Sequence, residues 1–357
     1  MSHHGRPRRF PTAFWSTMLA FAVLSLGLGG LFNGWKSRRL AELEAGSGIT
    51  LLSQGVMEFA ERGDGPPVLV IHGSPGGYDQ GLVYGQELIR RGCRVLAISR
   101  PGYLRTPLET GATFPEQADA ISELLTQRGI TVCGVLGVSE GSDCALELAS
   151  RHPEQVSSLV LLSPPGGSLG SLPIASIGYR LFHDLTGDIG CWILSLSAAW
   201  SPRKLFADMM ETGSTLRPSS RESIASLVMR EPDQQAFLKG LARSVTPLFP
   251  REHGIINDNA ELKDLPQPSS LPIRCPLLVL IGEHSTSTSI ESVGKRFQTF
   301  PGSRLEVIPE IGHILPVGAD FNRCWDGISA FFKQPAAPSD SKPDAGGKKA
   351  LDAAPSS

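Results

Sequence analysis

The sequence has few charged residues and no excess of either sign. Lys and Arg number 33 against 35 Asp and Glu, and the four types together make up 19% of the 357 residues. Soluble domains carry roughly 25%. A nucleic-acid-binding protein needs clustered positive charge to bind the phosphate backbone, so this balance disfavours that class. The length fits one large domain or two ordinary ones.

Motifs for metals, disulfide frameworks and nucleotides are also missing. The six cysteines include no Cys-x-x-Cys pair, and no histidine cluster has metal-ligand spacing, so neither a zinc site nor a disulfide framework is indicated. There is no GxxxxGK[ST] loop and no HExxH helix, and the glycine-rich run at residues 25–30 does not follow a strand. Each of these patterns carries its chemistry only in the right structural context. We therefore expect no cofactor and no metal.

Charge is absent altogether between Arg9 and Lys36. We predict a transmembrane anchor at residues 13–33, because about 20 apolar residues span the hydrocarbon core of a bilayer. Trp15 and Trp35 lie near its ends, where indole rings favour the interface. The alternatives are a cleaved signal peptide, whose apolar region is shorter and ends in a small-residue cleavage site, and a buried core helix.

The orientation of this anchor is not decided by charge. Three arginines precede the apolar run, and Lys36, Arg38 and Arg39 follow it, so the positive-inside rule gives a tie. A short N-terminal tail usually stays in the cytoplasm, which favours a periplasmic or other extracytoplasmic domain. The expected partners are a lipid bilayer and a small-molecule substrate, with no nucleic acid. The oligomeric state is left open.

Composition divides the rest of the chain. Residues 1–12 form a basic tail, 34–48 a linker and 49–333 the folded domain. Residues 334–357 are rich in Pro, Ala, Ser and Gly with one Leu and no aromatic residue. Such a segment cannot bury enough apolar surface to offset its ordering entropy, so we expect a disordered tail.

The folded domain alternates strands and helices. Short apolar runs, typical of strands buried on both faces, occupy 68–72, 94–99, 131–138, 157–163, 276–282 and 304–309. Helical patterns lie between them, notably at 114–128, 140–152 and 319–332. This alternation predicts an α/β fold with a mostly parallel sheet and helices on both faces. Residues 166–262, approximately, are helical throughout, and we predict a cap at the sheet edge where ligands bind.

One serine has the setting of a nucleophile. Gly137-Val138-Ser139-Glu140-Gly141 follows a predicted strand and precedes a predicted helix. The glycines allow a sharp turn that leaves the Ser139 hydroxyl exposed above the sheet. The dipole of the following helix also favours negative charge at this point. We predict that Ser139 is a catalytic nucleophile.

A glycine-rich turn and a late histidine complete the predicted site. His72-Gly73-Ser74-Pro75-Gly76-Gly77 directly follows another strand, and a turn there can aim a backbone N–H at an oxyanion. The expected donors are the backbone amides of Ser74 and Glu140. His313 follows the last predicted strand on a Gly-containing loop, at the edge where Ser139 also lies. We predict that His313 is the general base.

Together HGSPGG, SRPGY, GVSEGS and a late IGH resemble the α/β-hydrolase fold family over residues 49–332. The first and third are similar to its proline-iminopeptidase and esterase branch, and RPGYLRTP is similar to a bacterial group known only as hydrolases. The resemblance implies a serine hydrolase, either a carboxylic ester hydrolase or peptidase-like. It would cleave a small ester, amide or thioester through an acyl-enzyme on Ser139.

One departure from the family affects the catalytic acid. The acid usually stands three residues after the glycine that ends the seventh strand, and here that residue is Ser285. Glu283 could serve as a displaced acid, or Asp258 could reach in from the end of the cap. The third alternative is a Ser–His dyad, slow or inactive, since the acid orients the histidine and stabilises its charged form. The competing function is therefore a hydrolase-like protein that binds a ligand without turnover.

Overall fold

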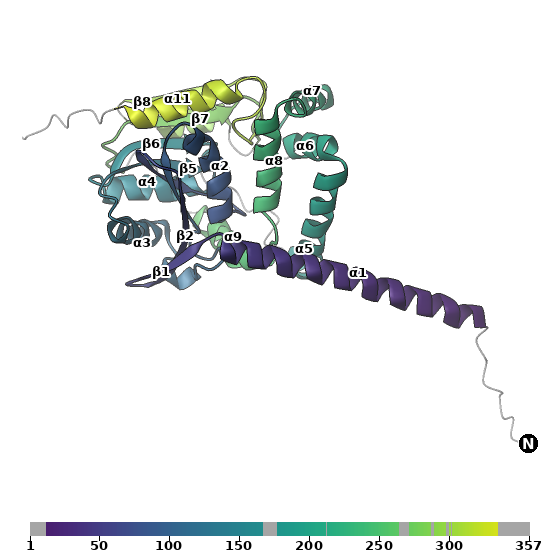
Figure 1. The fold of residues 1–357 in the computed structure, drawn as a ribbon. Helices are drawn as coiled ribbons and strands as arrows, with labels where there is room; N and C mark the ends of the chain where they lie inside the picture. Colours follow the sequence, from purple (N-terminus) through teal and green to yellow (C-terminus); the bar gives the residue numbers. More distant parts are fainter. Residues whose placement is uncertain are drawn as a thin grey trace, which may run out of the picture.

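The computed structural model describes residues 12–166, 177–211, 213–263, 271–286, 289–297, 300 and 302–334. The predicted basic tail at 1–12 lies almost wholly outside these residues, as does all but the first residue of the predicted tail at 334–357. The α/β fold class is confirmed: one mostly parallel sheet carries helices on both faces (Figure 1).

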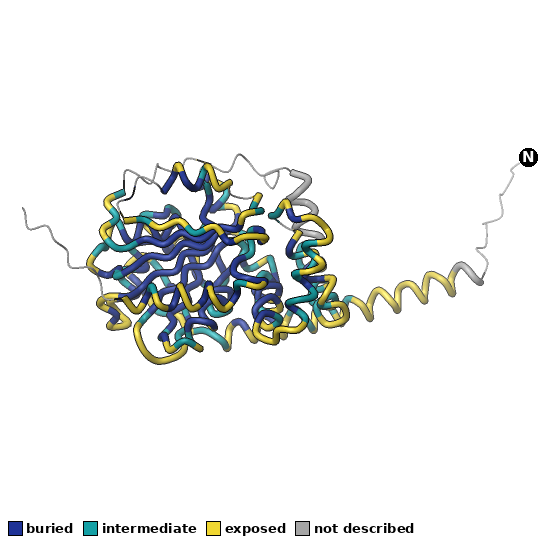
Figure 2. Tube along the Cα trace, turned by 90° about the horizontal axis from the view of Figure 1, so that it is seen from above, coloured by how far each residue is buried: buried dark blue, intermediate teal, exposed yellow. Residues whose placement is uncertain are grey.

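A single helix, α1 (Thr12–Ala45), projects from the domain like an arm (Figure 1). The part from Trp15 to Ala45 is long and apolar enough to cross a membrane, with a mean hydropathy of 1.7 over its most apolar window, and no residue of that window is buried. Figure 2 shows most of the described arm as exposed. By length and composition the helix fits an anchor and a signal sequence alike. It continues without a break through most of the predicted linker at 34–48.

The sheet has eight strands in the order β1-β2-β4-β3-β5-β6-β7-β8. They are β1 (Gly48–Leu52), β2 (Gly55–Arg62), β3 (Pro67–Ile71), β4 (Arg94–Ile98), β5 (Cys133–Val138), β6 (Val156–Leu162), β7 (Leu277–Gly282) and β8 (Ser303–Ile308). The pairs β1–β2 and β2–β4 are antiparallel and the other pairs are parallel. All parallel strands therefore end at the same edge.

Helices cover both faces of this sheet, and their apolar residues form two cores, visible as the dark interior of Figure 2. One core joins the sheet to α2 (Tyr78–Arg90) and α11 (Phe321–Lys333). The other joins it to α3 (Phe114–Gln127), α4 (Gly141–Arg151) and α10 (Ile290–Phe297). Because β3 to β7 are buried on both sides, they are continuous apolar runs.

The predicted cap consists of helices inserted between β6 and β7. They are α5 (Ile177–Trp200), α6 (Pro202–Glu211), α7 (Pro218–Val228), α8 (Pro232–Ser244) and α9 (Glu252–Glu261). Short 3₁₀ turns lie at Leu108–Thr110 and Phe249–Arg251 within the described residues. In Figure 1 the helices α5, α6 and α7 lie on the side of the body from which α1 projects.

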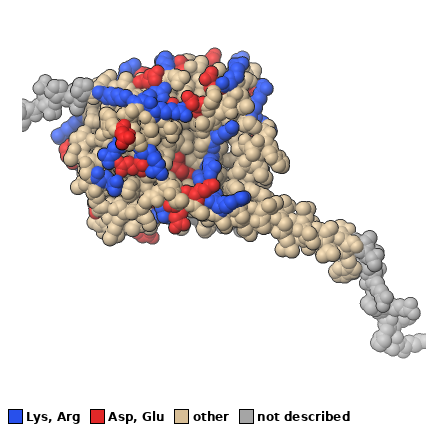
Figure 3. Space-filling model, viewed as in Figure 1, with Lys and Arg blue, Asp and Glu red and all other residues tan. Residues whose placement is uncertain are grey.

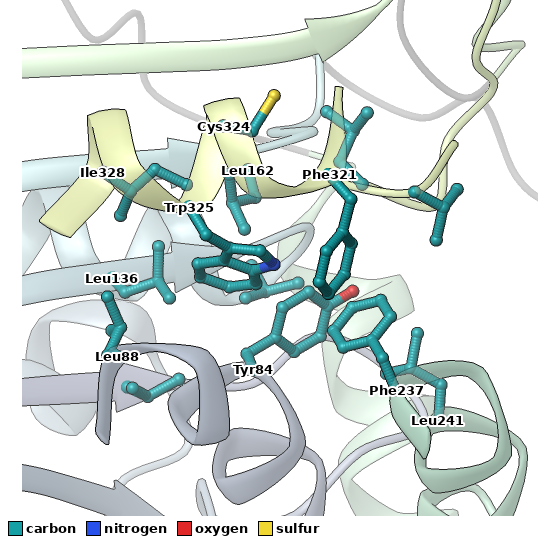
Figure 4. Packing of buried hydrophobic residues seen from close by; sticks show 14 of the residues in the cluster. Tyr84, Leu88, Leu136, Leu162, Phe237, Leu241, Phe321, Cys324, Trp325 and Ile328 are labelled. Carbon is teal, nitrogen blue, oxygen red and sulfur yellow. The ribbon is translucent and has the colours of Figure 1, made fainter. Parts of the chain in front are cut away.

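Aromatic rings attach the cap to the body. Phe237 of α8 packs edge-on against Tyr84 of α2, with ring centroids 5.3 Å apart, and against Trp325 of α11 at 6.3 Å. Figure 4 shows these rings converging with Phe321 between the three helices. Such pairs stabilise an interface beyond the area that they bury. The cluster fixes α8 above the sheet and thereby one wall of the cavity described next.

Candidate active site

Ser139 lies on a sharp turn between β5 and α4. Its φ of 47° is in the left-handed region, which is strained for a residue with a side chain. The Ser139 amide donates to the carbonyl of Leu162, 2.8 Å away on β6. A Cβ at Gly141 would stand 2.5 Å from the carbonyl oxygen of Ile71, so only glycine allows α4 to start this close to β3. The turn has the geometry expected of a nucleophile elbow.

His313 faces this serine from a loop after β8. Its Nε2 lies 3.2 Å from Ser139 Oγ, although 174 positions separate the two residues in sequence. Ser163, directly after β6, holds the loop by donating from its hydroxyl to the His313 carbonyl at 2.8 Å. The structure thus brings the predicted nucleophile and the predicted base within hydrogen-bonding distance.

The setting of His313 favours a neutral imidazole. One side of the ring lines a cavity, but burial of the ring lowers the pKa of His313 below its usual value, and the nearby Glu140 carboxylate opposes that shift only in part. A neutral Nε2 can accept the proton that Ser139 loses on attack. The buried Nδ1 of His313 has no hydrogen-bond partner among the residues that the structure describes.

Glu283 does not fill that position. Its carboxylate accepts a hydrogen bond from the backbone amide of Glu310 at 3.0 Å, and its side chain is 47% exposed. It therefore holds the loop after β8 through this contact. The role of Glu283 as the acid that orients His313 stays a prediction.

Asp258 is committed elsewhere too. Its side chain is 3% exposed and accepts from Arg100 Nη1 at 2.8 Å and from the Tyr103 hydroxyl at 2.5 Å. Arg100 is fully buried and depends on this carboxylate as its counter-charge. The alternative that Asp258 serves as the catalytic acid stays a prediction; α9 places its carboxylate in a buried ion pair with Arg100.

Replacing Asp258 by alanine is expected to lower the free energy of unfolding by about 3–5 kcal/mol, because the Arg100 guanidinium is left buried without its partner. Chemical denaturation monitored by circular dichroism measures this change. Asp119→Ala is the matched control, since Asp119 pairs with Arg151 at the surface, where such a pair is worth about 0–1 kcal/mol. Equal effects of the two substitutions would contradict the structural role of Asp258.

The two predicted oxyanion donors lie beside Ser139, and one of them has a partner. The Ser74 amide donates to the carboxylate of Glu140 at 2.9 Å. The position predicted for an oxyanion thus holds a side-chain carboxylate. The glycine-rich turn itself is held by Gln80, whose Oε1 accepts from the Gly73 amide at 3.0 Å.

Sequence reasoning did not identify the residues that position this turn. Nε2 of the fully buried His72 accepts from the Arg100 amide at 2.9 Å, and Arg100 Nε donates to the His72 carbonyl at 3.0 Å. Burial and the adjacent guanidinium lower the pKa of His72 well below its usual value. His72 is therefore a neutral structural residue. The RPGY segment could have indicated this contact. It directly follows a predicted strand, and so does HGSPGG, so both segments lie at the same edge of the sheet.

An apolar cavity of about 280 Å³ opens beside the Ser139–His313 pair. Most of its lining side chains are apolar, from the body and from the cap; they include Tyr84, Leu162, Leu194, Met209, Leu241, Val245, Ile314 and Leu315. Ligand pockets have this character, with a few polar groups that orient the ligand. Among the described residues no cluster of His, Cys, Asp or Glu could hold a metal ion.

Comparisons with known proteins agree with this geometry. A family model described as alpha/beta hydrolase fold matches residues 66–177, which include both the glycine-rich turn and the elbow. An uncharacterized hydrolase of Bacillus subtilis, YcgS, is 27% identical over 270 residues, covering 74% of this chain and 91% of that protein. The mouse sn-1-specific diacylglycerol lipase ABHD11 is 23% identical over 253 residues, covering 70% and 75%.

A solved structure is similar over nearly all of its length. An alpha/beta hydrolase fold protein from Nakamurella multipartita has a TM-score of 0.74 at 28% sequence identity, covering 80% of this chain and 98% of the other. The matched share leaves out about a fifth of this chain, as expected if the N-terminal helix and the C-terminal tail have no counterpart there.

Proposed function

This chain belongs to the α/β-hydrolase fold family, and we propose that it is a membrane-anchored serine hydrolase acting through Ser139. The observation that carries the proposal is the distance of 3.2 Å between Ser139 Oγ and His313 Nε2, on a strained elbow beside an apolar cavity. The substrate would be a small ester, amide or thioester.

The proposed reaction has two steps. Ser139 Oγ attacks the carbonyl carbon while its proton passes to His313 Nε2, and the carbonyl oxygen becomes an oxyanion. Collapse of this intermediate breaks the bond to the leaving group, which takes the proton from His313. Water then attacks the acyl-enzyme with His313 as base, releasing the acid and restoring the serine.

The oxyanion would bind the amides of Ser74 and Glu140. Because the Glu140 carboxylate accepts from the Ser74 amide in the ligand-free protein, its side chain must move aside when a substrate carbonyl enters. Removing a carboxylate from an oxyanion site also removes repulsion from the charge that develops there. Glu140 thus competes with the substrate for one donor, and its negative charge supports the imidazolium of His313.

Several features support a substrate with an apolar acyl group. The cavity is lined mainly by aliphatic and aromatic side chains, and burial of apolar surface on binding is favourable. The name of the mouse relative, a diacylglycerol lipase, agrees with an acyl ester. Of the three candidate bonds, ester, amide and thioester, an ester therefore fits best.

The contacts of α1 support an anchor rather than a cleaved signal sequence. The Arg39 guanidinium pairs with Asp79 at 2.7 Å, and the Tyr78 hydroxyl donates to the Leu43 carbonyl at 2.6 Å. The C-terminal turns of α1 are thus part of the domain, while its apolar N-terminal part is exposed. An unbroken helix that joins the two would hold the site close to the bilayer.

Turnover of a nitrophenyl ester series tests the proposal. The purified full-length protein in neutral detergent should hydrolyse the butyrate and octanoate esters with a higher kcat/KM than the acetate, because longer chains bury more apolar surface in the cavity. The Ser139→Ala variant supplies the background rate. Turnover at the native rate in this variant would remove Ser139 from the mechanism.

The pH profile should reflect the environment of His313. Burial lowers the pKa of His313, and only the neutral form acts as a base. The kcat/KM value should rise with pH through that pKa, so its acid limb should have a midpoint below the usual histidine value of about 6.5. Initial rates between about pH 4.5 and 8.5 measure this limb. A midpoint above the usual value would contradict the account.

A ligand-binding protein without turnover is the second candidate. The observation that favours it is the unpartnered Nδ1 of His313, because a catalytic histidine is normally oriented through that atom. Both candidates place a ligand in the same cavity. They differ in whether an acyl group becomes attached to Ser139.

A further inference from the structure

A second cavity lies between α1 and the cap, beside the active site. It has a volume of about 640 Å³. We call it the basic crevice; its lining includes Arg38, Arg39 and Glu42 of α1, Leu194 and Ser195 of α5, and Lys239, Ala242 and Arg243 of α8. Leu194 and Ala242 also line the active-site cavity. The basic crevice and the apolar cavity therefore share a wall.

Part of the charge in the basic crevice is neutralised within the protein. Arg39 is buried and pairs with Asp79 at 2.7 Å. The Arg243 guanidinium pairs with the Glu42 carboxylate. These pairs hold the root of α1 against α2 and α8. They do not neutralise Arg38 and Lys239, the other two cations of the lining.

Arg38 and Lys239 supply the surplus positive charge. Both are exposed, and neither forms an ion pair within the described part of the chain. Arg38 Nε donates to the Gly34 carbonyl at 3.2 Å, and Lys239 Nζ is 3.5 Å from Gln235 Oε1. In Figure 3 basic side chains edge the hollow above the root of α1, whereas the arm itself carries no charge beyond that root. An arginine and a lysine that line one cavity can both donate to a phosphate group.

The basic crevice faces the membrane if α1 spans it, because α1 is fixed to the cap. Lys36 pairs with Asp188 of α5 at 2.6 Å, and the rings of Phe32 and Trp192 lie edge-on with centroids 5.8 Å apart. In Figures 1 and 2 the cap helices lie on the side toward the arm. The apolar span of α1 and the basic crevice are thus adjacent along one rigid helix.

An exposed apolar stripe on α5 points to the same surface. Ile189, Ile193, Leu196 and Trp200 are spaced by four, three and four residues, which places them on one helix face. Ile193 is 56% exposed and Trp200 84%. An apolar helix face with a Trp beside basic residues is typical of helices that lie in the membrane interface.

We propose that the basic crevice binds the phosphate-bearing headgroup of an amphiphile from the adjacent leaflet, so that its acyl ester reaches Ser139. The phosphate lies between Arg38 and Lys239, and the acyl chain passes Leu194 and Ala242 into the apolar cavity. Water cleaves the ester by the two steps given above, releasing a fatty acid and a phosphate-bearing alcohol. The inference rests on the proposed serine hydrolase function and adds the substrate class.

Substrate preference in mixed micelles tests this assignment. The full-length protein is assayed with a lysophosphatidic acid and with the monoacylglycerol of the same acyl chain. The ratio of kcat/KM for the two lipids should fall by about tenfold in Arg38→Gln/Lys239→Gln, because each basic residue near a phosphate contributes about a fivefold preference or less. Arg128→Gln/Arg151→Gln, which removes one cation directly after α3 and one at the end of α4, should leave the ratio unchanged.

A ratio in the crevice variant equal to that of the control variant would overturn the proposal. Thermal unfolding of all proteins is recorded, and each single substitution is measured too, so that a fold defect in the double variant does not end the comparison. The substituted side chains are exposed, and we expect unchanged melting temperatures.

A binding measurement separates this inference from the proposed function. Ser139→Ala protein should bind a fluorescent lysophosphatidic acid about tenfold more weakly when it also carries Arg38→Gln/Lys239→Gln. That result without turnover by the native protein would support the crevice and overturn the hydrolase. Inorganic phosphate should not displace the lipid even at about 100 times the lipid's Kd. Displacement near that Kd would show a free-phosphate site and overturn the amphiphile.

Discussion

Replacing Ser285 by aspartate is expected to raise kcat for ester hydrolysis by about 10²–10⁴-fold, because loss of the acid alone costs a serine hydrolase about 10⁴. The reason lies in the contact between two loops. The backbone amide of His284 donates to the Ile311 carbonyl at 2.9 Å, so the turn after β7 lies directly against the loop that carries His313. A carboxylate at position 285 would be placed to accept from the buried, unpartnered Nδ1.

The control for this gain is Ser285→Asn. Asparagine has the shape of aspartate but no charge, so it cannot stabilise the imidazolium. Its amide can also donate a hydrogen bond, so it does not enforce the tautomer of His313 that carries its proton on Nδ1. Single-turnover rates with a nitrophenyl butyrate compare the two variants. Equal rates for the aspartate and asparagine variants would mean that position 285 does not reach His313.

Replacing Ser139 by alanine is expected to lower kcat, and the size of the loss depends on residue 285. In a full triad the nucleophile alone is worth about 10⁶ in kcat, whereas the acid alone is worth about 10⁴. Because no described acid contacts His313 Nδ1, Ser139→Ala should cost only about 10²-fold. In the Ser285→Asp background the same substitution should cost about 10⁴–10⁶-fold.

The four proteins of this cycle are measured with one ester under the same conditions. The two effects should be strongly non-additive, because residues that act as one catalytic unit lose their separate contributions when one is removed. Additive effects would indicate that Ser139 and position 285 act independently. That result would contradict the assignment of His313 as the group that links them.

Most of the sheet could be predicted from sequence because parallel strands are buried on both faces. The six apolar runs predicted as strands match β3 to β8 to within two residues at each end. The hairpin of β1 and β2 was not predicted. β2 mixes polar and apolar residues, as in the buried Glu58 and the half-buried Phe59, and antiparallel edge strands give a weaker signal than central ones.

The helical insertion between β6 and β7 and the N-terminal apolar helix were predicted as regions but not in their packing. The first helix of the insertion, α5, runs unbroken from Ile177 to Trp200, and no proline interrupts it. Helix α1 likewise continues to Ala45. The contacts of Arg39 with Asp79 and of Lys36 with Asp188 join segments far apart in sequence. No local sequence pattern predicts such pairs.

In the candidate site, too, the positions that the sheet fixes could be predicted, and the contacts that depend on packing could not. Ser139 and His313 follow strands, so the sheet edge places them and sequence could predict their meeting. The partners of the carboxylates could not be predicted, because they depend on how the cap and the loops pack. Asp258 turned out to neutralise the buried Arg100, and Glu283 to cap the Glu310 amide.

Labelling with a fluorophosphonate tests the central claim most directly. The reagent loses fluoride as Ser139 Oγ bonds to phosphorus and the serine proton passes to His313, so it reports an activated serine without a substrate. Peptide mapping by mass spectrometry should locate the adduct on Ser139, and the Ser139→Ala protein should show none. A native protein that stays unlabelled, or an adduct on another serine, would contradict the account.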